Sequence, residues 1–164
     1  MIFAPATHSA EEVIRLLRLE PLPREGGFFR RTAEAVAMVT TPRGGRPAWS
    51  MTLALFTPQQ FSALHRLAGD ELWCFHAGDP LELLLLREGE TGEARLGPGP
   101  DDRLQHVVPA GTWQGARIVP GGAWSLVTCM VVPAFHWDDF ELGRRDLLAS
   151  QFPGDGEAIR RLTR

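Results

Sequence analysis

The spacing of apolar residues divides the chain into a helical start, a long β-rich middle and a helical end. Ser9 and Glu12 have the spacing of a capping box, and the apolar residues that follow recur at helical intervals. This pattern predicts a short amphipathic helix over residues 10–19. Similar spacing near the end of the chain predicts helices over 142–150 and 156–163.

Between these helices, short β-type runs alternate with turn signals made of Gly, Pro and Asp. We expect strands over residues 35–40, 48–56, 60–65, 71–77, 81–87, 92–96, 104–109, 112–119 and 124–132. Many short strands with regular turns are typical of an antiparallel sandwich or barrel. Because the sequence has no internal repeat or linker, residues 1–164 are predicted to form a single domain.

Strand alternation indicates which side chains share the interior. Side chains point to opposite faces in turn, so Glu71 and Trp73 share one face and His76 takes the other. Gln114 is expected to join the first two residues inside the barrel. An acid, an amide and a large aromatic ring are an unusual set for a purely structural core. They favour a pocket that orients a partly polar ligand.

Charge and composition narrow the class of partner. The net charge is −3 and the pI is near 5.9, so no global basic field attracts nucleic acid or anionic lipid. The sequence has no apolar run of the ~20 residues that span a membrane. The N-terminal segment also lacks the basic start and long apolar stretch of a signal peptide, so a cytoplasmic location is expected.

The sequence lacks residue types that some catalytic mechanisms require. The sequence contains no Lys, Asn or Tyr, which excludes lysine Schiff-base catalysis and a tyrosine general acid. Cys74 and Cys129 are the only cysteines, and each lies in an apolar run. They are interpreted as small buried hydrophobic residues rather than as a disulfide or a zinc site.

Two segments resemble the motifs of the cupin superfamily. In the segment from Ser62 to Leu81, His65 precedes Glu71, and six residues separate Glu71 from Gly78. The stretch from Val107 to Gln114 resembles the second motif, a proline-x-glycine turn followed by a histidine; Gln114 stands at the histidine position.

Nearly the whole chain is similar to a subfamily of small single-domain cupins of unassigned activity. This resemblance rests on several short matches that occur in the same order along the chain. Among them are Glu25-Gly26-Gly27 and Phe140-Glu141-Leu142. The resemblance implies an all-β fold, a double-stranded β-helix (the jelly-roll or cupin barrel), with a short N-terminal helix and C-terminal helices.

The sequence departs from the metal-binding pattern that the resemblance implies. Ala63 stands where the first motif has a second histidine, and Leu22 stands where the subfamily often has histidine. A site of three histidines and a glutamate is thereby reduced to His65, Glu71 and Gln114. Glutamine is a poor transition-metal ligand compared with imidazole, so a metal is disfavoured, although these three residues are the candidates to hold one.

His65 and Glu71 are the candidate catalytic residues. The near-neutral intrinsic pKa of an imidazole suits acid–base work, and a buried carboxylate needs a cation, a donor or a metal nearby. His106 and His136 are expected at the rim and in a solvated loop. The candidate ligand-binding residues are Ser62, Trp73, Gln114, Phe28, Arg31 and Phe135.

Three functions remain open. Similarity to the sugar-nucleotide epimerase branch of cupins implies a metal-independent isomerase or epimerase of a carbohydrate- or nucleotide-like ligand, with His65 as acid or base. That branch relies on a tyrosine that this sequence lacks. The alternatives are a metal-dependent enzyme of the dioxygenase type and a non-enzymatic small-molecule binding protein. A homodimer is also expected, paired through segment 28–40.

Overall fold

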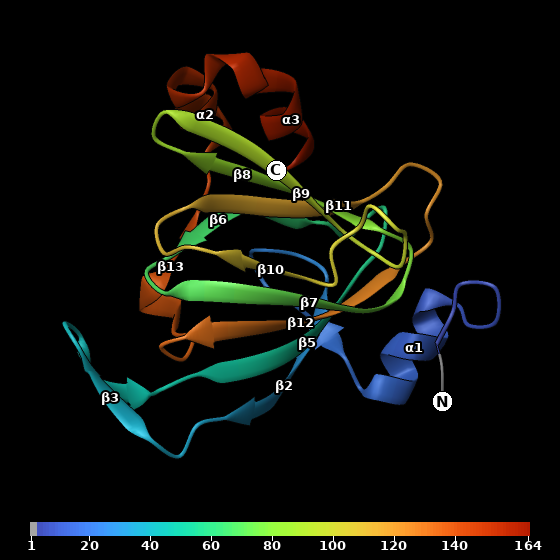
Figure 1. Ribbon diagram of the computed structural model, residues 1–164, viewed down its shortest axis with the longest axis horizontal. Helices are drawn as coiled ribbons and strands as arrows, with labels where there is room; N and C mark the ends of the chain where they lie inside the picture. Colours follow the sequence, from blue (N-terminus) through green and yellow to red (C-terminus); the bar gives the residue numbers. More distant parts are fainter. Residues whose placement is uncertain (1–2) are drawn as a thin grey trace.

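The computed structural model describes residues 3–164, which fold into two facing antiparallel sheets with helices at the periphery (Figure 1). The helices are α1 (Ala10–Leu17), α2 (Arg145–Gln151) and α3 (Gly156–Arg161), with 3₁₀ turns η1 (Trp137–Asp139) and η2 (Pro153–Asp155). The strands are β1 (Glu20–Pro21), β2 (Phe28–Glu34), β3 (Met38–Thr41), β4 (Gly44–Pro47), β5 (Ser50–Phe56), β6 (Ser62–Leu67), β7 (Asp70–Gly78), β8 (Leu81–Arg87), β9 (Glu90–Leu96), β10 (Gln105–Val108), β11 (Trp113–Ile118), β12 (Ser125–Val132) and β13 (Phe140–Leu142).

The strand order is that of a jelly roll. One sheet has the order β1-β2-β5-β12-β7-β10 and the other has the order β13-β6-β11-β8-β9, with antiparallel pairing throughout both sheets. The predicted all-β barrel with a short N-terminal helix and C-terminal helices is therefore confirmed. Strands distant in sequence become neighbours, because β12 lies between β5 and β7.

The apolar core fills the space between the sheets. Trp73, Trp124 and Phe56 are among the largest fully buried side chains. A second apolar cluster lies on the outer face of the smaller sheet, where Leu148 of α2 and Ile159 of α3 pack against its strands. The two C-terminal helices therefore cover a sheet face that would otherwise expose leucines to water.

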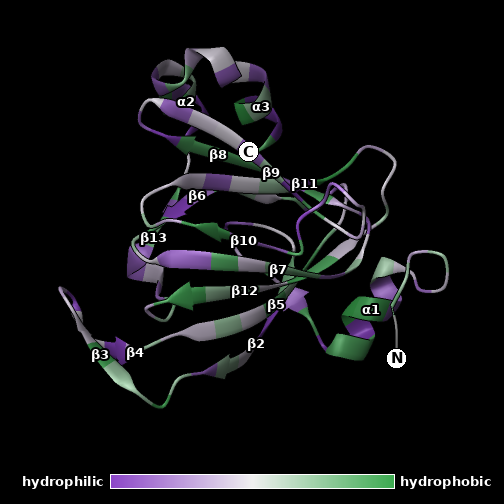
Figure 2. Cartoon of the chain, in the orientation of Figure 1, coloured by the Kyte–Doolittle hydropathy of each residue, from purple (hydrophilic) through white to green (hydrophobic). Residues whose placement is uncertain are grey.

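Helix α1 forms as its sequence predicts. The Ser9 hydroxyl accepts a hydrogen bond from the backbone N–H of Glu12, and the Glu12 carboxylate accepts one from the backbone N–H of Ser9. Hydrophobic and hydrophilic bands alternate along this helix (Figure 2). Its Val13 is fully buried in the main core, so α1 closes one end of the barrel.

The segment before β5 differs from the prediction. A single strand was expected over residues 35–40, whereas the chain forms β2 and then a β3–β4 hairpin that belongs to neither sheet. The hairpin projects from the barrel (Figure 1), and its region includes Val36, which is 98% exposed, and Met38, which is 62% exposed. The apolar residues of this segment therefore do not mark a core strand, which is why their pattern misplaced it.

The part of the chain that the structure describes contains no helix that is both long enough and apolar enough to cross a membrane.

Gly78 at the end of β7 gives a test of the fold. It has a φ of +102°, and a Cβ at this position would lie 2.3 Å from the carbonyl oxygen of Trp124. Gly78→Ala should therefore lower the free energy of unfolding in urea by several kcal/mol, about 1–3 from backbone strain alone. Gly44 is the matched control, since its φ is +103° and nothing lies within 4 Å of its Cβ position. Equal losses in the two variants would contradict the packing argument.

Candidate functional site

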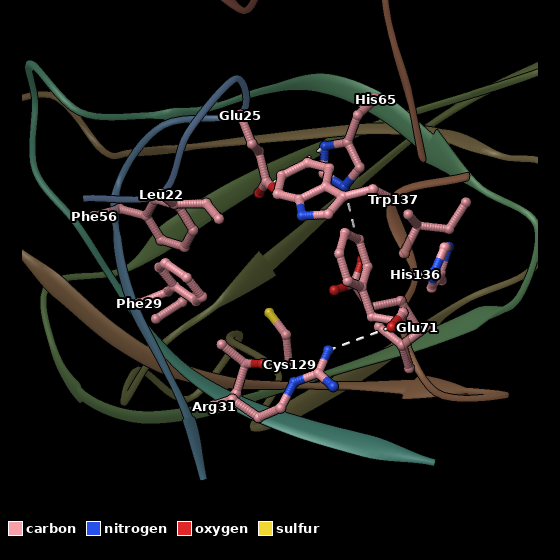
Figure 3. Close-up of a pocket in the computed structure, with 15 residues that line it drawn as sticks. Leu22, Glu25, Phe29, Arg31, Phe56, His65, Glu71, Cys129, His136 and Trp137 are labelled. Atoms are coloured by element: carbon pink, nitrogen blue, oxygen red, sulfur yellow. Dashed lines mark hydrogen bonds and ion pairs between the residues drawn. The ribbon is translucent and has the colours of Figure 1, made fainter. Parts of the chain in front are cut away.

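A cavity of about 220 Å³ lies inside the barrel, against the larger sheet (Figure 3). Its lining residues come from five strands (β2, β5, β6, β7 and β12), from the β1–β2 loop and from the segment after β12 that includes η1. They are Leu22, Glu25, Phe29, Arg31, Thr52, Ala54, Phe56, His65, Leu67, Glu71, Cys129, Val131, Phe135, His136 and Trp137. Most of the wall is apolar or aromatic, with a few polar groups, as is usual for small-molecule sites.

Strand alternation selects these side chains. Arg31 of β2 pairs with Thr52 of β5, which pairs with Cys129 of β12, and all three line the cavity. The next inward-facing rung of the sheet pairs Val131 of β12 with Glu71 of β7. Since side chains on one rung of a sheet point to the same face, the register of these strands places an arginine and a glutamate on one wall.

Three titratable side chains gather at one end of the cavity. The Nε2 atom of His65 lies 3.8 Å from Oε2 of Glu71, and its Nδ1 atom lies 4.0 Å from Oε1 of Glu25 (Figure 3). His65 and Glu71 are almost fully buried, and the Glu25 side chain is 14% exposed. Glu25 also accepts a 2.7 Å hydrogen bond from the hydroxyl of Ser62.

Hydrogen bonding fixes which nitrogen of His65 faces the cavity end. Its Nδ1 atom lies 2.8 Å from the carbonyl oxygen of Ala63. A carbonyl only accepts, so Nδ1 carries a proton and Nε2 is the atom that gains or loses one beside Glu71. The ring also stacks on Phe140, with centroids 5.2 Å apart and planes 18° apart, which holds its orientation.

The two carboxylates decide the charge of His65. Burial alone lowers the pKa of His65, but the negative charges of Glu25 and Glu71 and the bond to the Ala63 carbonyl outweigh burial and raise the pKa from 6.5 to about 9. Burial raises the pKa of the Glu25 carboxyl, an effect that His65 opposes and Glu71 reinforces. The imidazole is therefore cationic at neutral pH.

Cys129 lies in the cavity wall but is not an activated thiol. Burial, together with the negative charges of Glu71 and Glu25, raises the pKa of the Cys129 thiol well above its usual value. A thiol in such surroundings stays protonated and is a poor nucleophile.

Gln114 supports Glu71 and does not line the cavity. The indole Nε1 of Trp73 donates to Oε1 of Gln114 at 2.9 Å, and Nε2 of Gln114 donates to Oε2 of Glu71 at 2.6 Å. An indole N–H can only donate, so Trp73 fixes the orientation of the amide. Trp73 itself is buried in the core against Phe56, outside the cavity lining.

This arrangement does not fit the metal site that the barrel implies in relatives with more histidines. The carbonyl oxygen of Gln114, its only metal-ligating atom, is bound by Trp73, and its amide N–H is directed at Glu71. Within residues 3–164, no group of three or more His, Cys, Asp or Glu side chains has an arrangement that could hold a metal ion. Trp73, Gln114 and Glu71 form a hydrogen-bonded chain instead, and His65 lies beside its end at 3.8 Å from Glu71.

The structure places the other predicted site residues as follows. Arg31 and Phe135 line the cavity, whereas Phe28 and Ser62 do not. Phe28 and Arg31 have opposite parity in β2, so Phe29 takes the wall position and Phe28 packs on the core beside α1. Ser62 is buried and acts on the site through Glu25.

Sequence reasoning missed several residues of the site, among them Glu25, Trp137 and Phe29. Glu25 comes from the loop before β2, and Trp137 comes from η1, which no alternation pattern indicates. Phe29 could have been found, because it shares a face of β2 with Arg31. His136 lies in an exposed loop, as expected, yet that loop forms part of the cavity wall.

The rim of the cavity is tied to the projecting hairpin. Arg43 and Arg46 of the β3–β4 region both form ion pairs with Asp139, the last residue of η1. Arg31 donates to the carbonyl oxygen of Phe135 at 3.3 Å. These contacts hold the loop that carries Phe135 and Trp137 over the cavity.

Comparison with known proteins agrees with this architecture. A family model described as Cupin superfamily (DUF985) matches residues 11–143, and the chain therefore belongs to this cupin family. A hypothetical protein from Leishmania major is 30% identical, with a TM-score of 0.88 over 95% of this chain and 99% of its own. A protein from Shewanella oneidensis is 35% identical, with a TM-score of 0.87 over 96% of this chain and 99% of its own. A comparison with curated proteins found no significant match.

More distant structures share the fold alone. Oxalate decarboxylase from Bacillus subtilis is 12% identical, with a TM-score of 0.54 over 88% of this chain and 37% of its own. Vicilin from hazelnut is 11% identical, with a TM-score of 0.53 over 88% of this chain and 43% of its own. An enzyme and a vicilin on one fold show that the barrel does not define the activity.

The charge of His65 can be measured directly. Nitrogen-detected NMR of the imidazole should show His65 still protonated at pH 7.5 and titrating near pH 9. Glu71→Gln should move this pKa down toward 6.5, because it removes a nearby negative charge and acceptor. Glu141→Gln is the control, since Glu141 is exposed and pairs with Arg66. A wild-type His65 that titrates at or below 6.5 would show that burial dominates.

Proposed function

We propose that this cupin binds a small organic molecule in its barrel and transfers protons on it without a metal, as an isomerase or epimerase does. The observation that carries the proposal is the convergence of Glu25, His65 and Glu71 on one end of a cavity whose wall is mostly apolar. Burying ionisable groups is costly, and such clusters in clefts are concentrated at functional sites.

The charge state assigns different roles to the three groups. A cationic His65 is an acid, so its Nε2–H would donate to a carbonyl oxygen of the ligand as negative charge develops there. Glu25 is the base in this proposal, because burial raises its pKa and so makes its carboxylate a stronger base for removing a proton from carbon. Glu71, held by Gln114, keeps His65 protonated.

Of the two roles expected for His65, acid or base, this proposal assigns it the acid. With Nδ1 bonded to the carbonyl oxygen of Ala63 and Nε2 beside a carboxylate, a cationic imidazole has no free lone pair with which to accept a proton. The missing tyrosine is less of an obstacle on this basis, because His65 supplies the acid.

The size of the cavity limits the ligand. Sites for drug-sized ligands usually measure roughly 300–1,000 Å³, more than the volume of about 220 Å³ here. A whole sugar nucleotide would extend through the rim into solvent. A monosaccharide or a small oxo acid is therefore a better match than the nucleotide-like ligand that resemblance to the epimerase branch implies.

The acid–base proposal is tested by hydrogen exchange. Small sugars and oxo acids are incubated with the protein in D₂O, and loss of the C–H signal next to the carbonyl is followed by proton NMR. His65→Gln and Glu25→Gln should each slow the exchange by about 100-fold or more. His76→Gln is the control, because His76 lies on the outer face of β7 and bonds to Thr128.

Two results would contradict the proposal. Exchange that persists in His65→Gln would remove His65 from the chemistry. Probes that bind tightly to the wild-type protein without any exchange would favour a non-enzymatic binding protein. A dioxygenase-type function has less support, because Gln114 does not present a metal-ligating atom to His65 and Glu71.

We also propose that two copies pair through segment 28–40. Support comes from the apolar side chains that this region exposes, Val36, Met38 and Val39. Light scattering of the wild-type protein should give the mass of a dimer. Val36→Asp combined with Met38→Asp should give a monomer, because burying two carboxylates at an apolar contact is unfavourable. Leu147→Asp, on the exposed side of α2, is the control. A wild-type monomer would contradict this pairing.

A further inference from the structure

Besides the acid–base cluster, the cavity wall has a second polar group, the guanidinium of Arg31. Arg31 is the only Arg or Lys side chain among the described residues that line the cavity. It lies on β2, and Glu71 lies on β7, with β5 and β12 between them. Their backbones are separated by three strand-to-strand spacings across the sheet and by two residues along the strand direction, which amounts to about 15 Å along the sheet. The acid–base cluster and Arg31 therefore occupy different parts of the cavity wall, here called its two polar ends.

The Arg31 guanidinium is positioned but not saturated. In Figure 3 its side chain points toward the cavity, where Nη2 donates to the carbonyl oxygen of Phe135 at 3.3 Å. Its Nη1 donates to Glu34 at 3.2 Å, in an ion pair whose side chains are 42% and 54% exposed. Exposed ion pairs are weakly held, and a guanidinium has five N–H donors in all. Arg31 thus keeps donors for an incoming anion.

The surface between the two polar ends is aromatic and aliphatic. Phe29, Phe56, Phe135 and Trp137 supply rings from four different segments. Phe135 and Trp137 meet edge to face with centroids 5.1 Å apart, so they form a single wall. A ligand that fills this space has an apolar or flat body.

Charge at the far end excludes a second anionic group. Glu25 and Glu71 lie on either side of His65, so a dianion long enough to reach them would be repelled by buried carboxylates. A monocarboxylate avoids this repulsion, because its charge stays at Arg31, and its planar group matches the guanidinium fork.

We propose that the ligand of this cavity is a small monocarboxylic acid with an apolar or aromatic body, bound through its carboxylate to Arg31. Its reactive carbon lies toward His65 and Glu25. This inference rests on the proposed function for its reactive end, but the recognition of the carboxylate depends on Arg31 alone.

The test compares an acid with its neutral analogue of the same shape. Phenylacetate and phenylacetamide are titrated into the wild-type protein by calorimetry. The carboxylate should bind at least about tenfold more tightly than the amide, because a charge-assisted bidentate contact is lost in the amide. Arg31→Gln should remove the difference by weakening the carboxylate only. Arg30→Gln should keep it, since Arg30 is exposed on the opposite face of β2.

Three outcomes would overturn the inference. They are equal affinity of the wild-type protein for the acid and the amide, no binding of either compound, and an unchanged preference in Arg31→Gln. Thermal unfolding of each variant confirms that the protein is folded when it is titrated. The variant His65→Gln separates the two proposals. If it abolishes hydrogen exchange, the acid–base proposal holds regardless of the effect of Arg31→Gln on ligand affinity. If His65→Gln leaves hydrogen exchange intact, and phenylacetate still binds more tightly than phenylacetamide in an Arg31-dependent way, only the acid–base proposal fails.

Discussion

The imidazole of His65 carries a positive charge between two carboxylates in the interior of the barrel. Each of these buried carboxylates, Glu71 and Glu25, in turn needs a hydrogen-bond donor. Glu71 receives a hydrogen bond from Gln114, whose carbonyl oxygen is held by the indole of Trp73. Glu25 receives one from Ser62. Buried charges are tolerated only when they are paired and hydrogen-bonded, so these residues form one unit that extends from the core to the cavity.

The direction of this hydrogen-bonded chain determines what the barrel can do. The indole can only donate, so the amide must offer its N–H to Glu71, and Glu71 is left as the acceptor that faces His65. A metal would require the opposite polarity, with oxygen and nitrogen lone pairs directed at a common point. The substitution of glutamine at a position where cupins have histidine therefore accompanies a change in the kind of site, from lone-pair donors to a proton-carrying pair.

The remaining parts of the cavity are supplied by segments outside the regular barrel. The loop that carries Phe135 and Trp137 is held by Arg43 and Arg46 through Asp139. Residues on connecting segments often provide function on a rigid scaffold, and here the scaffold supplies the acid–base end while the loops supply the aromatic wall.

The sequence alone determined the elements with strong periodicity and the residues that share a face within one strand. The capping box of α1, most strands of the two sheets and the interior position of Glu71 could be predicted from local spacing, and the pocket position of His65 from the resemblance to the first cupin motif. Tertiary structure decided which of those interior residues reach the cavity. Trp73 and Glu71 share a face of β7, yet Trp73 lies deeper in the core and Glu71 at the cavity end. Glu25 and Trp137 enter the site from loops distant in sequence, and only the packing of the two sheets brings them to His65. Local periodicity carries no information about such long-range contacts, and so the charge of the central histidine could not be read from the sequence.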